Sequence, residues 1–213
     1  MFADPADVER SRVEFQASSY ARLPKFFGPR FLDCILDLSE RGHWKPINRK
    51  GFDSCLELSP GSALDVLYFV INWPNVLDIV HRITGCGPFS WFDGHVYRMA
   101  PDAGHHDEWH TDNTNGRLVA MSVNLSLHEY EGGLLQIRGR GAPHTLCEVA
   151  NVGLGDALLF RISENLVHRV TEVHGTSPKT AFAGWFYATQ PSLLHRLHDQ
   201  SAAQTLVSIK RNH

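Results

Sequence analysis

Two stretches in the first half of the chain space their hydrophobic residues as amphipathic helices do. The first lies between the turn at 24–29 and Gly42, and its apolar positions recur at intervals of three and four, at Phe31, Leu32, Ile35, Leu36 and Leu38. This spacing predicts a helix over about 29–41. The second follows Pro74 and stops before Gly85, which predicts a helix over 75–84. Between them, the apolar segment 63–72 suits a helix or a strand equally well.

From about residue 94 the pattern changes to short β-rich runs separated by Gly, Asn and Pro. Such a rhythm is typical of a β-sandwich or a small barrel. Eight runs carry the pattern: HVYRM, DEWHTD, RLVAMSVNLSL, GGLLQIRGR, TLCEVA, DALLF, LVHRVTEV and TAFAGWFYA.

These patterns divide the chain, which we take as one domain over 1–213, into three parts. Residues 1–93 are expected to form a helical N-terminal support that packs on the outside. Residues 94–188 are expected to form a double-sheet core, and 189–213 a C-terminal tail whose leucines are compatible with a helix. The fold class is therefore mainly β, flanked by N-terminal helices.

Composition narrows the classes of protein that need to be considered. A content of 43% hydrophobic and 20% charged residues supports a large core and excludes a disordered or fibrous chain. The net charge of −3 gives no broad attraction for nucleic acid or anionic lipid, so neither is an expected partner. Four scattered cysteines without a CxxC pair favour a reducing compartment, and we expect a cytoplasmic protein with no export signal and no membrane span.

Chemically competent side chains concentrate in the run EWHTDN at 108–113. His110 and Asp112 lie two residues apart at a predicted strand end, so both side chains would leave the same face. His168 lies in a second predicted strand. Two histidines and one carboxylate suit non-haem Fe(II), with coordination positions left open. An H-x-D pair is a weak signal in a chain with thirteen histidines, and the ordinary alternative is histidines satisfied by hydrogen bonds.

Five segments in unbroken order give this triad its context. Together they resemble the Fe(II)/2-oxoglutarate-dependent dioxygenases, in particular the prolyl-hydroxylase-like branch, and they read HTDNTNGRLVAMSVNLS, EGGLLQI, GDALLF, LVHRVTEV and KTAFAGWFY. The resemblance covers roughly 94–188, with the helix at 29–41 also in its expected place. It implies a double-stranded β-helix, a distorted jelly roll, in which His110, Asp112 and His168 bind the iron.

The same resemblance assigns candidates for binding 2-oxoglutarate, a dianion whose far carboxylate needs a buried cation. Lys179, which opens the last predicted strand, matches the family's basic position. Arg169 is the alternative, although strand alternation turns it away from the metal. Tyr97 resembles the first-strand tyrosine that contacts the cosubstrate, and a plain core tyrosine explains it equally well. Asn124 stands where relatives often carry a tyrosine, as a hydrogen-bonding candidate.

The implied activity uses Fe(II), 2-oxoglutarate and O2 to hydroxylate a C–H bond, with succinate and CO2 as co-products. Asp112 favours hydroxylation over halogenation, because halogenating relatives replace this carboxylate with a small residue. The expected substrate is an amino-acid-like, peptidyl (prolyl among them) or other small molecule, recognised by loops such as 43–60 and 100–109. The sequence specifies no oligomeric state.

Two other classes of function remain open at this stage. One is a non-catalytic metal-binding or sensing domain on the same fold, against which the complete triad and Lys179 argue. The other is a zinc hydrolase on a cupin-like barrel, for which Glu108 would be the general base near the metal-bound water.

Overall fold

A seven-stranded antiparallel sheet forms the larger layer of the molecule, with the strand order β1-β9-β5-β12-β4-β3-β2. The computed structural model describes residues 4–49, 52–104, 108–114, 116–150 and 153–188. The strands of this sheet are β1 (Tyr20–Leu23), β2 (Trp44–Arg49), β3 (Phe52–Leu58), β4 (Trp91–Met99), β5 (Arg117–Asn124), β9 (Ala157–Arg161) and β12 (Lys179–Tyr187).

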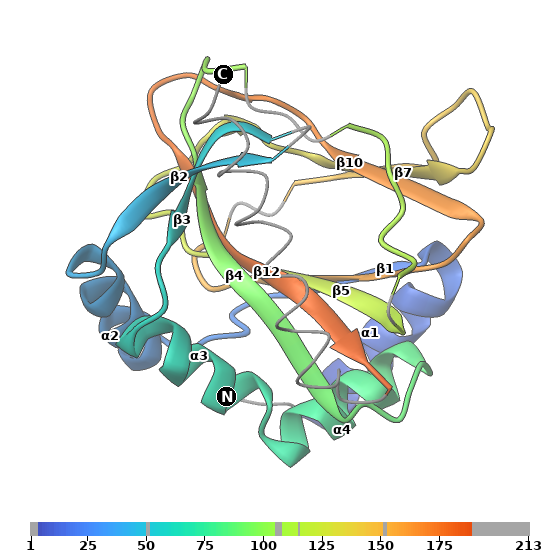
Figure 1. Ribbon diagram of the computed structural model, residues 1–213. Coiled ribbons are helices and arrows are strands. Elements are labelled where there is room, and N and C mark those ends of the chain that lie inside the picture. Colours follow the sequence, from blue (N-terminus) through green and yellow to red (C-terminus); the bar gives the residue numbers. More distant parts are fainter. Residues whose placement is uncertain (1–3, 50–51, 105–107, 115, 151–152, 189–213) are drawn as a thin grey trace.

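A smaller layer of strands faces one side of this sheet (Figure 1). It contains a three-stranded sheet of order β10-β7-β8 and the two-stranded pair β11-β6. Its strands are β6 (Glu131–Gly132), β7 (Leu135–Gly139), β8 (Cys147–Val149), β10 (Leu166–Val170) and β11 (Val173–His174). A cluster of apolar side chains joins the layers: Ala120, Leu158 and Phe160 come from the large sheet, Leu135, Ile137 and Val149 from the small one.

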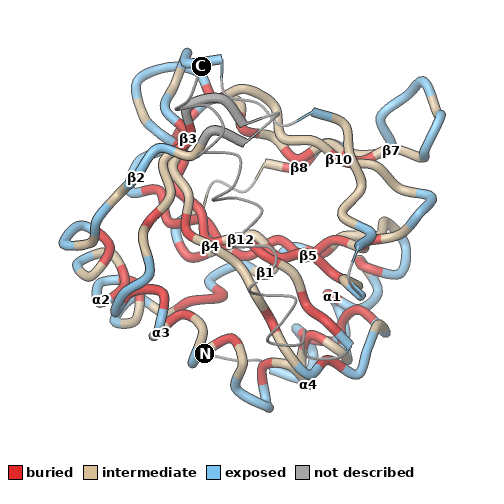
Figure 2. Tube along the Cα trace, viewed as in Figure 1, coloured by how far each residue is buried: buried red, intermediate tan, exposed pale blue. Residues whose placement is uncertain are grey.

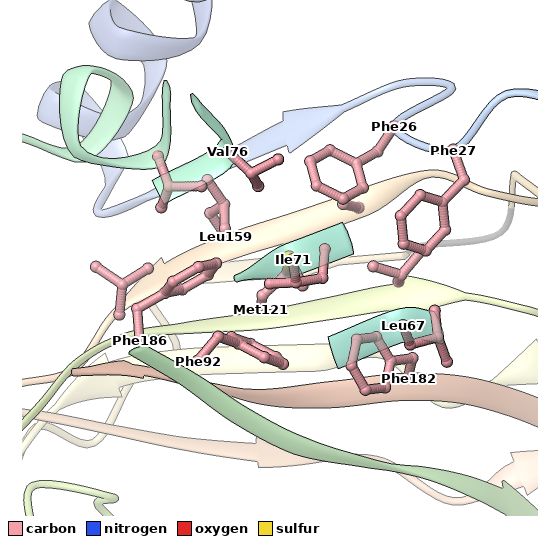
Figure 3. Close-up of a cluster of buried hydrophobic side chains, with 14 of the residues drawn as sticks. Phe26, Phe27, Leu67, Ile71, Val76, Phe92, Met121, Leu159, Phe182 and Phe186 are labelled. Carbon is pink, nitrogen blue, oxygen red and sulfur yellow. The ribbon is translucent and has the colours of Figure 1, made fainter. Parts of the chain in front are cut away.

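Helices cover the opposite face of the large sheet (Figure 1). They are α1 (Pro5–Ser18), α2 (Pro29–Glu40), α3 (Ser62–Ile71) and α4 (Pro74–Thr84). Figure 2 shows that buried residues concentrate along β4, β5 and β12, the central strands of the large sheet. In the close-up of Figure 3, Leu67 and Ile71 of α3 and Val76 of α4 pack against Phe92, Phe182 and Phe186 of the sheet. The main core therefore lies between helices and sheet and leaves the other face of the sheet for the site.

Both predicted helices are confirmed, by α2 and α4. Each begins with proline at its first turn, and α4 ends at Gly85, whose left-handed φ of 65° suits glycine. The ambiguous segment 63–72 is helical: α3 buries Ala63, Leu64, Leu67 and Ile71, the stripe of a helix facing a core. Among the described residues no single helix has the length and apolar character of a membrane span, although α3 and α4, bent by 59°, pass that test as a pair.

The N-terminal 93 residues contain more than the expected helices, and this expectation needs correction. Strands β1, β2 and β3 join the large sheet, and β2 and β3 occupy most of the segment 43–60 that was expected to be a loop. The reason is compositional: β2 is an outermost strand that carries Lys45 and Pro46, so it lacks hydrophobic alternation. Helix α1 was also not predicted, because it buries only Val8, Ser11 and Phe15.

The predicted strands from residue 94 onward are confirmed in seven of the eight runs, since β4 to β12 fall within them or overlap them. The exception is DEWHTD, which forms no strand among its described residues 108–112. Only His110 pairs there, through an isolated bridge to His168. The predicted tail helix at 191–213 lies outside the described residues.

Candidate active site

A cavity of about 450 Å³ opens between the two layers. The large sheet supplies its floor through β4, β5, β9 and β12, and the small sheet supplies its roof through β7, β8 and β10. Ile47 of β2 and Cys55 of β3 line one side. The polar and charged residues at its wall include His95, Tyr97, Glu108, His110, Asp112, Arg117, Ser122, His168 and Lys179.

His110, Asp112 and His168 meet at this wall. One potential ligand atom from each lies within 4.8 Å of the other two. The Nε2 atom of His110 is 3.6 Å from Oδ1 of Asp112, and Nε2 of His168 is 3.3 Å from Oδ2. The chain brings them together by the backbone bridge, in which His110 and His168 each donate an N–H to the other's carbonyl, at 3.0 and 2.9 Å. The three side chains converge as the sequence predicted, but His110 lies in an isolated β-bridge and not at the end of a strand.

The directions of the pKa shifts of Asp112 and His168 suit a metal site. Burial alone would raise the pKa of Asp112, but hydrogen bonds and positive charge from His110 and His168 outweigh it and hold this pKa well below its ordinary value. Burial lowers the pKa of His168 and so favours the neutral imidazole. The Nδ1 atom of His110 lies 2.7 Å from the carbonyl oxygen of Glu108, a contact that sets the orientation of the ring. A carboxylate and neutral imidazoles are the forms that bind a divalent metal.

Asp112 is also held by two residues outside the triad. The indole Nε1 of Trp185 donates to its Oδ2 at 2.7 Å, and the guanidinium of Arg117 approaches its Oδ1 at 3.6 Å. The guanidinium carbon of Arg117 stacks 3.7 Å from the centre of the Trp185 ring. Sequence reasoning singled out neither residue. The alternation of β12, which places Trp185 on the same face as Lys179, was the available signal.

Lys179 is placed as the sequence predicted, at the first residue of β12 and in the cavity wall. Its side chain is 5% exposed, and its Nζ donates to the carbonyl oxygen of Gly133 at 2.7 Å. Gly133, at a left-handed φ of 60°, makes room for it, since a Cβ there would lie 2.9 Å from Cδ of Lys179. Arg169, the alternative cation, does not line the cavity: its Nε donates to Gln136 and its guanidinium lies over Trp109.

The two weaker candidates for the cosubstrate differ in position. Tyr97 lines the cavity from β4. Asn124 does not line it: its Oδ1 accepts the backbone N–H of Ser126, while its Nδ2 is buried without a partner among the described residues. On the same strand as Asn124, Ala120 and Ser122 line the cavity, because the helices cover the other face of the sheet.

Comparison with known proteins agrees with this geometry. Residues 94–187 match the family model of the 2OG-Fe(II) oxygenase superfamily. This segment is 94 of the 213 residues, and over it the chain is similar to the 2OG-Fe(II) oxygenase superfamily. No curated protein matches it in sequence. The match and the fold together indicate an oxidoreductase, and the enzymes of this superfamily use Fe(II), 2-oxoglutarate and O2.

Solved structures extend the likeness over most of the chain. A 2OG-Fe(II) oxygenase family protein from Burkholderia pseudomallei superposes with a TM-score of 0.69 at 13% identity, over 90% of this chain and 96% of that one. A prolyl hydroxylase from Trichoplax adhaerens, in complex with a peptide fragment of hypoxia inducible factor, gives 0.61 at 14%, over 87% and 94%. The epimerase SnoN, in complex with Fe3+, alpha ketoglutarate and nogalamycin RO, gives 0.63 at 12%, over 86% and 84%. At these identities the likeness shows the fold, the double-stranded β-helix predicted from the sequence.

The side chains of this oxygenase fit the iron and the cosubstrate of the superfamily. Two imidazoles and one carboxylate on one side of a metal leave positions for further ligands. The buried ammonium of Lys179 in the same cavity supplies the cation that a dicarboxylate needs.

Proposed function

We propose that this oxygenase hydroxylates a C–H bond of an amino-acid-like or peptidyl substrate, a prolyl side chain included, and releases succinate and CO2. The observation that carries the proposal is the convergence of His110, Asp112 and His168 on a cavity that also buries Lys179. When bound, ferrous iron with 2-oxoglutarate and O2 supplies the oxidation of an unactivated C–H bond.

The residues of the chain hold and orient the reactants in this proposal. His110, Asp112 and His168 bind the metal. Lys179 neutralises the far carboxylate of 2-oxoglutarate, and Tyr97 contacts the cosubstrate from β4. The small sheet covers the site and excludes water, which strengthens each of these electrostatic contacts.

The size of the cavity supports a substrate that enters as one side chain or a small molecule. About 450 Å³ is modest among ligand cavities, and the cosubstrate shares this volume with the reacting group. The prolyl hydroxylase of Trichoplax adhaerens has the same fold and binds a peptide, which supports a peptidyl substrate here. Ile47 and Cys55, from the hairpin that β2 and β3 form, line the cavity and are the residues that we expect nearest the substrate.

A cytoplasmic location is part of the proposal. The cysteines of the described chain, Cys34, Cys55, Cys86 and Cys147, are thiols outside disulfides, as a reducing compartment would leave them.

Anaerobic reconstitution tests the proposal. The metal-free protein receives Fe(II) and then 2-oxoglutarate, and the visible charge-transfer absorption of the ternary complex is recorded. Oxygen is then admitted with a library of amino acids and prolyl peptides, and succinate is measured. We expect the band, and succinate that rises with a matching substrate.

The Asp112→Ala protein is the matched control and should give neither signal. A band without succinate under any substrate would favour the non-catalytic sensing domain. Zinc retention with hydrolytic activity, and no band, would favour a zinc hydrolase with Glu108, which lines the cavity, as its general base.

A further inference from the structure

The Asp112 carboxylate accepts a hydrogen bond from a residue outside the triad. The carboxylate of an aspartate rotates easily about χ2, because this torsion has no sharp staggered wells. In this chain the Trp185 indole N–H donates to Oδ2 of Asp112 at 2.7 Å. The side chain of Asp112 is 15% exposed, so little water competes for that oxygen.

Arg117 and Tyr187 hold the indole in place. Arg117 of β5 stands directly across from Tyr187 of β12 in the sheet register. Its Nε donates to the Tyr187 hydroxyl at 3.1 Å, and its guanidinium stacks on the Trp185 ring at 3.7 Å. Since Trp185 and Tyr187 are two residues apart on one strand, they share a face, and the guanidinium bridges them. The Arg117 guanidinium therefore packs on one face of the indole ring, and the Asp112 carboxylate accepts the N–H at the edge of the ring.

We propose that Trp185 is a positioning residue of the metal centre, which fixes the Asp112 carboxylate so that one oxygen faces the metal. This inference rests on the proposed function, because it assigns Asp112 as a ligand. With Oδ2 engaged by the indole, the metal would bind through Oδ1, which lies 3.6 Å from Nε2 of His110, and a carboxylate that binds through one oxygen keeps further coordination positions open. Arg117 acts on the metal through Trp185 and through its charge beside Oδ1.

Metal affinity of the full chain is the first measurement. The metal-free protein is titrated with Mn(II), with free Mn(II) followed by electron paramagnetic resonance. The Trp185→Phe change removes the N–H donor and keeps a ring for Arg117 to stack on. We expect weaker binding by about 10-fold or more, the usual effect of losing a partner of a metal ligand. The control is Trp73→Phe, at a tryptophan that is 49% exposed, and it should bind as the wild type does.

A spectroscopic measurement separates positioning from a general loss of structure. The energy of the anaerobic Fe(II)–2-oxoglutarate band reports the ligand field, and we expect it to shift in Trp185→Phe but not in Trp73→Phe. The unfolding midpoint of the metal-free proteins is recorded beside it. A change in the midpoint with unchanged Mn(II) affinity and an unchanged band would mean that Trp185 only packs, and would overturn the inference.

A second variant decides the question if Trp185→Phe does not fold. Arg117→Lys keeps the positive charge but loses the planar stack and the bond to Tyr187, so we expect a smaller loss of Mn(II) affinity and a band shift in the same direction. Where both variants fold, the double variant should bind no more weakly than Trp185→Phe alone, because both act through one carboxylate. Wild-type affinity in Arg117→Lys, or additive losses in the double variant, would overturn the coupling. A wild-type protein that binds no Mn(II) or Fe(II) would instead overturn the proposed function itself.

Discussion

Replacing Lys179 with alanine should separate the binding of 2-oxoglutarate from the binding of the metal. The ammonium is 5% exposed and lies in the cavity wall, so solvent screens its charge little. Removing one partner of a buried, hydrogen-bonded charge pair costs about 2–5 kcal/mol. At 1.4 kcal/mol for each factor of ten, this corresponds to roughly a 30- to 4,000-fold loss of affinity for 2-oxoglutarate. The metal should bind as before, because Lys179 is outside the donor cluster.

The assay is an anaerobic titration of 2-oxoglutarate into the Fe(II) protein, followed through the charge-transfer band, with Mn(II) affinity measured separately. Lys45→Ala is the matched control, since Lys45 is an exposed lysine that also lies on a strand of the large sheet. Lys179→Arg keeps the charge and should retain part of the affinity. If Lys179→Ala bound 2-oxoglutarate as tightly as the wild type, the cation for the far carboxylate would have to be another residue and the reasoning from burial would be refuted.

Three further changes test other parts of the structure. Asp112→Ala should abolish hydroxylation and weaken Mn(II) binding, and retained turnover in a succinate assay would show that this carboxylate is not a ligand. Asn124→Ala should lower the free energy of unfolding by about 1–3 kcal/mol, because it leaves the buried N–H of Ser126 unpaired; a tenfold loss of 2-oxoglutarate affinity would instead show that the Nδ2 donor of Asn124 reaches the cosubstrate. Gly184→Ala should destabilise the fold by about 1–3 kcal/mol or more in chemical denaturation, since its Cβ would lie 2.1 Å from a backbone oxygen of β4. Gly139→Ala, whose Cβ would meet its nearest atom at an ordinary 3.5 Å, is the matched control, and equal stabilities of the two variants would contradict this packing argument.

The parts of the fold that the sequence predicted are those in which local pattern and tertiary environment agree. Helices α2 and α4 carry apolar stripes and have proline and glycine at their ends, and most of the core strands alternate in hydrophobicity. The edge strands do not follow this rule. Strand β1 buries only Ala21, and the described side chains of β2 are exposed or half-buried, so neither strand shows a hydrophobic alternation that predicts its place at the border of the sheet.

The site was predictable to the extent that it depends on residue type and order. His110, Asp112, His168 and Lys179 were found in this way, and the structure brings all four to one cavity. Trp185 was missed, because an indole reads as an ordinary core residue until its N–H is seen to meet a carboxylate across 73 positions of sequence. Contacts of this range depend on strand register, which a single sequence specifies only weakly.

Both borders of the seven-stranded sheet are built by the first 58 residues of the chain: β1 pairs with β9 on one border, and β3, with β2 beyond it, pairs with β4 on the other. The segment that matches the family model, 94–187, contains none of these three strands. Excised by itself, it would expose the backbone of β9 and β4 as open templates for pairing with other copies, which is a route to aggregation. Any shortened version for crystallisation or directed evolution therefore has to retain the chain from Tyr20 onward, even though the chemistry begins some ninety residues later.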